Sequence, residues 1–214
     1  MLSIKNLSKS FSKKKYFFSK SAKHKKIIKN LSFETSNSSI TFVQGSNGTG
    51  KTTFLKLLSG IILADRGAIS LDNKKIKRDQ IDYIDSSERS FFWRLSVKEN
   101  LLFFARVNFL PAETIQKIDI FLKEFNCYEL RNIEFMKLSS GEKQRINLVR
   151  AFLKNARIML FDEVTNSIDE ESKNILYTKV KDAANNGKII FWSSHDLEER
   201  ELLKCTHALD LENI

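Results

Sequence analysis

Residues 45 to 53 read GSNGTGKTT, a glycine-rich stretch that fits the phosphate-loop pattern Gly-x4-Gly-Lys-Thr. The apolar, β-rich run SITFVQ at 39–44 leads into it, and a helical pattern that begins TTFLKLL follows. Glycines let successive backbone N–H groups turn inward around an anion, and the dipole of the following helix adds positive potential. The order of strand, loop and helix therefore predicts a phosphate site made of Gly45, Ser46, Asn47, Gly48, Thr49, Gly50, Lys51, Thr52 and Thr53.

Two side chains of this loop have separate expected tasks. Lys51 is expected to reach the β and γ phosphates of a nucleotide, and the Thr52 hydroxyl is expected to ligate Mg²⁺.

The run RIMLFDE supplies a second element of the site, because open parallel sheets place their ligand groups at strand ends. We expect Asp162 to bind Mg²⁺, directly or through water, and Glu163 to orient and deprotonate an attacking water.

Two further residues fit the same site. His195 lies in SSHD after the apolar run KIIFW and could contact the γ phosphate, and Asp169 follows the acidic pair in a loop. A lone histidine or aspartate is more often a surface or core residue than a catalytic one. Their assignment therefore depends on the rest of the constellation.

The arrangement of apolar runs predicts an α/β fold. Short β-rich runs are LSIKNL at the start, SITFVQ, AISL, IDYI, RIMLF and KIIFW, with helical patterns between them. The segment from about 95 to 153 has helical periodicity throughout, and Pro111 suits the first turn of a helix over AETIQKIDIFLKEF. We predict one domain over 1–214, with an α/β core of about 1–90 and 154–214 and an inserted helical subdomain of about 91–153.

Composition limits the class of protein. The chain has 214 residues, 42% of them hydrophobic and 29% charged, and no apolar run reaches the ~18 residues of a membrane span. The start lacks the layout of a signal peptide, so we expect a cytoplasmic protein. Cys127 and Cys205 form no CxxC pair and are expected to be reduced thiols.

The net charge of +10 is concentrated in the lysine-rich stretch from Ser12 to Lys26. Such a stretch can contact anionic lipid headgroups or nucleic acid. It can also be a solvated surface loop, which is the commoner meaning of a charge run and the interpretation that we favour. The sequence leaves both interpretations open.

The residues that decide the family are LSSGEKQR at 138–145, shortly before RIMLFDE. With the phosphate loop, the acidic strand end and the later histidine, they follow the order of motifs in the ATP-binding-cassette (ABC) ATPases, which the chain resembles over nearly its whole length. Carried over by position, Ser139, Ser140 and Gly141 belong to the signature, Ser167, Ile168 and Asp169 to the D-loop, and His195 to the switch. Read alone, Ser139 and Ser140 would be good N-caps for an amphipathic helix.

The resemblance implies a P-loop NTPase (RecA-like) core with N-terminal antiparallel β strands and an inserted α-helical subdomain. It implies ATP and Mg²⁺ as cofactors, and a head-to-tail homodimer or heterodimer of ATPase subunits in which the signature faces the ATP of the partner. It also implies transmembrane permease subunits as partners and a peripheral place at the cytoplasmic face of the inner membrane. An exporter-like subunit is expected, and no specific nucleic acid.

The chain departs from the family's commonest pattern at several positions. Ser140 and Glu142 replace glycine and glutamine in the signature, and Val164 stands where proline usually follows the catalytic glutamate. Ser86 and Ser87 occupy the Q-loop, which normally holds a glutamine. The residue that stacks on adenine could be Phe11, Tyr16, Phe17 or Phe18. Phe11 aligns best, although a core phenylalanine is the alternative.

Three functions compete. The leading one is the ATP-hydrolysing subunit of an ABC transporter, and Phe91, Phe92 and Trp93 near the Q-loop are expected either to grip the permease or to pack inside the helical subdomain. A soluble ABC ATPase acting on DNA or ribosomes would use the positive charge but usually carries further domains. A small-molecule kinase would leave LSSGEKQR unexplained.

Overall fold

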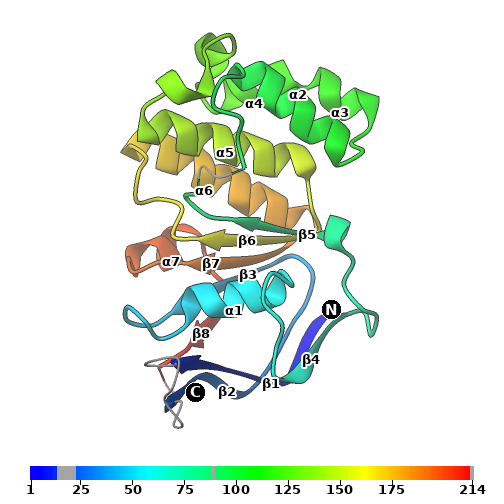
Figure 1. The fold of residues 1–214 in the computed structure, drawn as a ribbon, viewed down its shortest axis with the longest axis vertical. Coiled ribbons are helices and arrows are strands. Elements are labelled where there is room, and N and C mark those ends of the chain that lie inside the picture. Colours follow the sequence, from blue (N-terminus) through cyan, green and yellow to red (C-terminus); the bar gives the residue numbers. More distant parts are fainter. Residues whose placement is uncertain (14–22, 88–89, 213–214) are drawn as a thin grey trace.

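The computed structural model describes residues 1–13, 23–87 and 90–212, which form two sheets with helices around them (Figure 1). The smaller sheet is antiparallel in the order β2-β1-β4, and the larger is parallel in the order β5-β6-β7-β3-β8. The strands of the smaller sheet are β1 (Leu2–Lys13), β2 (Lys23–Thr35) and β4 (Arg66–Leu71). Those of the larger sheet are β3 (Ser39–Gln44), β5 (Ile81–Ile84), β6 (Ile158–Asp162), β7 (Ile189–Ser193) and β8 (His207–Asp210).

Helices connect and cover these strands. They are α1 (Lys51–Leu58), α2 (Val97–Val107), α3 (Ala112–Gln116), α4 (Ile118–Glu124), α5 (Ser140–Lys154), α6 (Glu170–Asn185) and α7 (Glu198–Leu202). Short 3₁₀ turns occur at Arg78–Gln80, Tyr128–Leu130 and Phe135–Lys137. The described chain therefore has the α/β class that the sequence predicts.

Helix α1 lies between the two sheets (Figure 1). Its buried Phe54 makes an edge-on ring contact with Phe191 of β7, with the ring centroids 5.8 Å apart. The same core cluster contains Leu2 and Ile4 of β1, so α1 joins the antiparallel sheet to the parallel one. Burial of this apolar surface fixes the start of α1, and with it the phosphate loop, against the parallel sheet.

A second core covers the opposite face of the parallel sheet. Helices α5 and α6 lie on this face, with α2, α3 and α4 beyond α5 (Figure 1). Phe161 of β6 and Trp192 of β7 are fully buried here, with ring centroids 5.1 Å apart. Because β6 and β7 are covered on both faces, their sequences read as continuous apolar runs.

All six β-rich runs of the sequence form strands, but β2 and β8 are additional. Strand β2 begins KHKKIIKN, whose lysines give no alternating apolar pattern. It forms because it pairs along β1, which places Ile28 and Leu31 in the core. Strand β8 is a four-residue edge strand that pairs in parallel with β3, and so short a run is invisible without that partner.

The segment expected to be helical contains α2 to α5 and no named strand in its described residues. The single helix expected after Pro111 is two helices, because α3 ends at Gln116 and α4 begins at Ile118. Pro111 is the residue before α3 rather than part of its first turn, with an extended ψ of 148°. Its fixed φ of −57° suits this boundary position.

Candidate nucleotide site

Backbone geometry in the phosphate loop requires glycine at two positions. Gly45 has a φ of 144°, and a Cβ there would lie 2.6 Å from Oγ1 of Thr49. Gly50 has a φ of 114°, and its Cβ would lie 2.6 Å from a methyl group of Ile27 on β2. A side chain at either position would strain the backbone and clash, so the glycines permit the turn from β3 into α1.

Lys51 begins α1, and its ammonium group lies at the centre of the site. The side chain is 5% exposed, and its Nζ donates to the Gly45 carbonyl at 2.6 Å. The same Nζ lies 3.3 Å from Nδ1 of His195 and 3.6 Å from Oε1 of Glu163. The fold therefore brings Lys51, Glu163 and His195 together, as the sequence predicts for a phosphate site.

Glu163 and His195 are in direct contact. Nε2 of His195 lies 2.8 Å from Oε1 of Glu163. The backbone of Glu163 is left-handed, with a φ of 52°, and its N–H donates to the Ser193 carbonyl at 3.1 Å. A non-glycine residue with this backbone is uncommon and is concentrated at functional sites.

The carboxylate of Asp162 receives hydrogen bonds from three hydroxyl groups. The Thr52 and Ser193 hydroxyls donate to Oδ1 at 3.2 Å and 2.8 Å, and the Tyr83 hydroxyl donates to Oδ2 at 2.6 Å. Burial and the nearby Asp162 raise the pKa of Tyr83 well above its ordinary value, so its hydroxyl keeps the proton that it donates. Thr52 and Asp162 are therefore adjacent, as expected of a shared Mg²⁺ site.

Tyr83 and Ser193 join the candidate site through their hydrogen bonds to Asp162, although the reasoning from sequence patterns did not single them out. Both precede the motif positions on which that reasoning depended, in IDYID and in SSHD. Successive side chains of a strand point to opposite faces of the sheet. The positions of Tyr83 in β5 and Ser193 in β7 could therefore have placed both side chains on the face that α1 covers. The hydrogen bonds that make them part of the site depend on the strand order.

A cavity of about 330 Å³ opens above the phosphate loop. Phe11 at the end of β1 lines it and is 41% exposed, so this ring is a surface group beside the loop rather than a core residue. The neighbouring Ile27 is a second apolar wall that the sequence reasoning did not include. The other lining residues are Ser46, Asn47, Gly48, Gly50, Lys51, Thr52, Thr53 and Glu163.

The LSSGEKQR stretch forms the N-terminus of α5. Ser139 is the N-cap: its Oγ accepts from the Glu142 N–H at 3.3 Å and donates to the Glu142 carboxylate at 2.8 Å. The Ser139 N–H donates to the same carboxylate at 2.8 Å, and these bonds lower the pKa of Glu142. Ser139 and Glu142 therefore form a capping box, which accepts glutamate as well as the usual glutamine at this position.

Gly141 brings the start of α5 against the segment before α6. A Cβ at Gly141 would lie 2.9 Å from the Ser167 carbonyl oxygen, so a larger residue would push the two segments apart. Asp169 is the N-cap of α6 and accepts from the Ser172 N–H at 2.8 Å. None of Ser139, Ser140, Gly141 and Asp169 lines the cavity above the phosphate loop.

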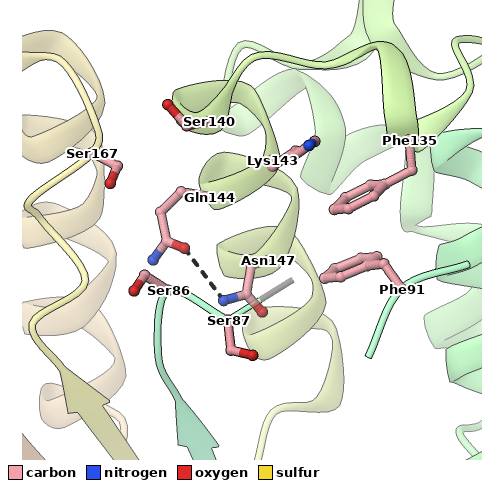
Figure 2. A pocket seen from close by; sticks show the side chains of 9 residues that line it. All are labelled: Ser86, Ser87, Phe91, Phe135, Ser140, Lys143, Gln144, Asn147 and Ser167. Atoms are coloured by element: carbon pink, nitrogen blue, oxygen red, sulfur yellow. Dashed lines mark hydrogen bonds between the residues drawn. The ribbon is translucent and has the colours of Figure 1, made fainter. Parts of the chain in front are cut away.

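A separate small pocket of about 40 Å³ lies between the end of β5 and α5 (Figure 2). Ser86 and Ser87 line it from the β5 side and Ser140 from the start of α5, with Ser167 beside them. Asn147 on α5 donates to the Asp85 carbonyl at 2.5 Å, which holds the segment after β5 against the helix. The segment at 85–87 and the start of α5 are thus packed together.

Comparison with known protein families gives a match over more than half of the chain. The family model described as "ABC transporter" matches residues 28–166, which include the phosphate loop, LSSGEKQR and the acidic end of β6. The chain belongs to the ABC transporter family. It is an ATP-binding subunit of such a transporter, an ATPase that couples ATP hydrolysis to transport. ABC ATPase subunits associate with transmembrane permease subunits.

Similar ABC proteins include both export and energy-coupling-factor systems. The chain is 29% identical over 88% of its length to energy-coupling factor transporter ATP-binding protein EcfA1 of Mycoplasmoides gallisepticum, of which it covers 70%. It is 30% identical over 84% of its length to lipopolysaccharide export system ATP-binding protein LptB of Haemophilus influenzae, of which it covers 78%. A solved ATP-binding subunit of an ABC transporter aligns over 98% of this chain and 85% of its own, at a TM-score of 0.84 and 24% identity.

The departures from the usual ABC motifs have structural explanations. Val164 is 1% exposed, and its carbonyl accepts from Nε2 of Gln144 at 3.2 Å. An apolar residue at this position is therefore part of the core, and its backbone links the end of β6 to α5. Ser86 and Ser87, at the usual place of the Q-loop glutamine, line the pocket against α5.

The aromatic stretch after the Q-loop divides between the two expected roles. Phe91 is 7% exposed and stacks on Phe135 with the ring centroids 4.2 Å apart. Phe92 and Trp93 are 48% and 53% exposed, and Phe92 makes an edge-on contact with the exposed Phe103 of α2. We call Phe92, Trp93 and Phe103 the aromatic cluster.

The remaining sequence predictions concern the lysine-rich stretch and the cysteines. Residues 14–22 of that stretch lie outside the described residues, so its lipid or solvent role stays a prediction.

Both cysteines are free, and burial raises the pKa of Cys127 to about 11 and of Cys205 to about 12. None of the helices in residues 1–13, 23–87 and 90–212 combines the length and hydropathy of a bilayer span.

Proposed function

We propose that this ABC ATPase subunit works in a head-to-tail dimer, with itself or with a related subunit, around two ATP molecules and their Mg²⁺ ions. One observation carries the proposal: the motif residues form two separate groups. Lys51 of the phosphate loop contacts Glu163 and His195, whereas the signature residues do not line the cavity above this loop. Each group by itself is half of an ATP site, and a second subunit can supply the other half.

Thr52 and Asp162 fit a divalent cation. Hydroxyl and carboxylate oxygens are the ligands that Mg²⁺ prefers, and these two groups lie 3.2 Å apart. Mg²⁺ bound there would neutralise charge on the β and γ phosphates. The proposed ligands lie on α1 and at the end of β6, which the core holds rigidly together.

The remaining residues have distinct roles in this proposal. Lys51 and the backbone N–H groups at the start of α1 bind the phosphates. Glu163 accepts the proton of the attacking water, and His195, 2.8 Å from Glu163, contacts the γ phosphate. Phe11, exposed at the cavity rim, stacks on the adenine ring.

The signature and D-loop of one subunit face the ATP of the other in this arrangement. The positive end of the α5 dipole, at Ser139, Ser140 and Gly141, is suited to an incoming γ phosphate. Asp169 at the start of α6 lies beside it, because Gly141 packs against the Ser167 carbonyl. The same packing would link the position of the D-loop to that of the signature.

The dimer would act on separate permease subunits at the cytoplasmic face of the inner membrane. The exposed aromatic cluster is the surface that we assign to this contact. Export remains our prediction for the direction of transport, because the similar proteins include systems of both kinds. We expect no specific nucleic-acid partner.

Mixed dimers of two inactive variants test the proposal. Lys51→Ala removes the phosphate-binding ammonium, and Ser139→Arg blocks the signature. In a dimer of one variant with the other, one site contains both defects and the other contains neither. ATP-driven dimerisation should therefore reappear when the two variants are mixed, with hydrolysis as a second measurement.

The controls are each variant alone and a mixture of two Lys51→Ala chains carrying different tags. If the signature acted within its own chain, every subunit would stay defective and mixing would restore nothing. Failure to recover dimerisation, with both variants folded, would remove the sandwich arrangement from this protein. Binding of ATP to the Ser139→Arg monomer shows separately whether its own phosphate loop is intact.

A further inference from the structure

We infer that Tyr83 is a positioning residue of the metal site, holding the Asp162 carboxylate in the orientation that binds Mg²⁺. The inference rests on the proposed Mg²⁺-ATP site and assigns a residue outside its motifs. It starts from the hydrogen bond of 2.6 Å between Oη of Tyr83 and Oδ2 of Asp162. That length is typical of a hydroxyl that donates to a charged carboxylate, which is a strong class of hydrogen bond.

The position of Tyr83 on β5 explains how the contact forms. Side chains alternate along a strand, and Ile81 and Tyr83 pack with the core on the α1 side, whereas Ile84 belongs to the core on the α5 side. Strand β5 pairs in parallel with β6, so that Tyr83 lies opposite Leu160. The long tyrosine side chain spans the two remaining residues to the end of β6 and reaches Asp162 there.

Three different elements orient this carboxylate. Tyr83 comes from β5, Thr52 from α1, and Ser193 from β7. Tyr83 is the one that contacts Oδ2, and the other two contact Oδ1, among the hydrogen bonds of the described residues. With each oxygen held from a different side, the plane of the carboxylate is fixed.

Thr52 has two tasks in the proposed site, and Tyr83 has one. The Thr52 hydroxyl is itself a proposed ligand, so its geometry toward Asp162 depends on the ion. Tyr83 is not a proposed ligand, so its hydroxyl can donate to Oδ2 whether or not the ion is present. Residues that orient a metal ligand in this way commonly change metal affinity 10-fold to 100-fold when they are lost.

Strand β5 contacts the proposed metal site through the Tyr83 hydroxyl, which lies three residues before Ser86 of the Q-loop. Ser86 follows the strand and lines the pocket against α5, near Gln144 (Figure 2). It does not line the cavity above the phosphate loop. Within β5, Tyr83 is the residue with a hydrogen bond to Asp162.

The test is the Mg²⁺ dependence of nucleotide binding by Tyr83→Phe. Affinity for ADP is measured by calorimetry in excess Mg²⁺ and in EDTA, and the ratio of the two affinities reports metal binding. The substitution keeps the ring and removes one donor, so the ratio should fall by ~10-fold or more, while affinity in EDTA stays within about two-fold of the original. Hydrolysis is not needed for this readout.

Tyr177→Phe is the matched control. Tyr177 also donates its hydroxyl to a buried carboxylate, that of Glu199, at 2.8 Å. It lies on α6, and Glu199 receives a further bond from Trp192 rather than from the phosphate-loop region. This control should lower thermal stability in the same way as Tyr83→Phe without changing the Mg²⁺ ratio.

The same substitution in an Asp162→Asn chain tests whether the effect of Tyr83 depends on Asp162. In an Asp162→Asn chain, Tyr83→Phe should change the Mg²⁺ ratio no further, because the oriented charge is already absent. An unchanged ratio in Tyr83→Phe, with the original chain clearly Mg²⁺-dependent, would overturn the role of Tyr83 and leave the proposed ATP site standing. An original chain whose ADP binding ignored Mg²⁺ would overturn the proposed metal site itself.

Discussion

At the scale of single residues, Glu163 combines a left-handed backbone with contacts to other residues of the phosphate site. Its φ of 52° is in the left-handed region, and its side chain lies between His195 and Lys51. The backbone bond from Glu163 to Ser193 joins the ends of β6 and β7 and holds this conformation. Such a conformation costs free energy, about 1 kcal/mol or more, which the surrounding fold must offset.

Replacement of this residue by glutamine separates its chemical role from its structural one. Glu163→Gln keeps the shape and the backbone preference of the side chain but removes the proton acceptor. ATP hydrolysis should fall ~10²-fold to 10⁴-fold while ATP binding survives. Phosphate release and the binding of a fluorescent ATP analogue measure the two quantities.

Glu129→Gln provides the matched control for this substitution. The Glu129 side chain is 90% exposed on a 3₁₀ turn, so the same chemical change there should leave hydrolysis unaltered. Loss of ATP binding together with turnover in Glu163→Gln would show that Glu163 is structural. The general base would then be another residue around the cavity.

At the scale of elements, Asp65 connects the start of β4 to β1. Its carboxylate accepts from Nζ of Lys9 at 2.8 Å and from the N–H and Oγ of Ser10 at 2.7 Å and 2.9 Å. These bonds, that of Lys9 first, lower the pKa of Asp65 from 3.8 to about 2. The neighbouring Phe11 is the proposed adenine-stacking residue, so this junction supports one wall of the cavity.

The lowered pKa gives a pH dependence with a definite sign. The charged carboxylate stabilises the folded chain above pH 3.8, and this contribution is lost as pH falls toward about 2. Asp65→Asn should therefore be less stable than the original chain at neutral pH, with the difference shrinking through that window. Urea unfolding at a series of pH values measures it.

The outcome that contradicts this prediction is a constant difference in unfolding free energy between the two chains from neutral pH to pH 2. Asp79→Asn is a suitable control, since Asp79 lies on an exposed 3₁₀ turn outside the β1–β4 junction. Its substitution should leave the pH profile unchanged.

At the scale of the whole molecule, each of the two cores supports a different part of the proposed functional surface. The core around α1 supports the phosphate loop, and the core around α5 supports the signature and the aromatic cluster. Phe91 is anchored in the second core by its stack on Phe135, while Phe92 and Trp93 remain exposed. An exposed aromatic group on a rigid base is typical of a protein interface.

Loss of the aromatic cluster should release the subunit from its permease. In cells that carry the native transporter, Phe92→Ser with Trp93→Ser should reduce the share of the chain recovered with membranes by ~10-fold or more. Alkaline washing of the membranes should release the original chain, as expected of a peripheral subunit. ATP binding by the purified variant should be unchanged, since the cluster does not line the ATP cavity.

Phe109→Ser is the control, because Phe109 is 92% exposed in the turn after α2 and is not part of the aromatic cluster. Equal membrane recovery of the double variant and the original chain would show that the permease binds elsewhere. Recovery of ribosomes or DNA with the original chain would instead favour the ATPase that acts on nucleic acid.

The sequence by itself determined the family, the class of fold and the identity of the chemical groups. Three motifs could be recognised because the residues of each are adjacent in sequence and form one loop, helix start or strand end. They are GSNGTGKTT, LSSGEKQR and the acidic end of RIMLFDE. Six of the strands were visible for the same reason: their apolar residues are adjacent in sequence. Strand β2 was not, since its lysines hide the few residues that face the core.

Only the tertiary structure decided which groups meet. Tyr83 reaches Asp162 because β5 and β6 are neighbours in the sheet, although 79 residues separate the two side chains in sequence. Phe91 is buried because its ring stacks on the buried Phe135. Phe92 stays exposed because its ring contacts Phe103, which is itself exposed. Burial and hydrogen bonding depend on partners distant in sequence, and no local pattern records those partners.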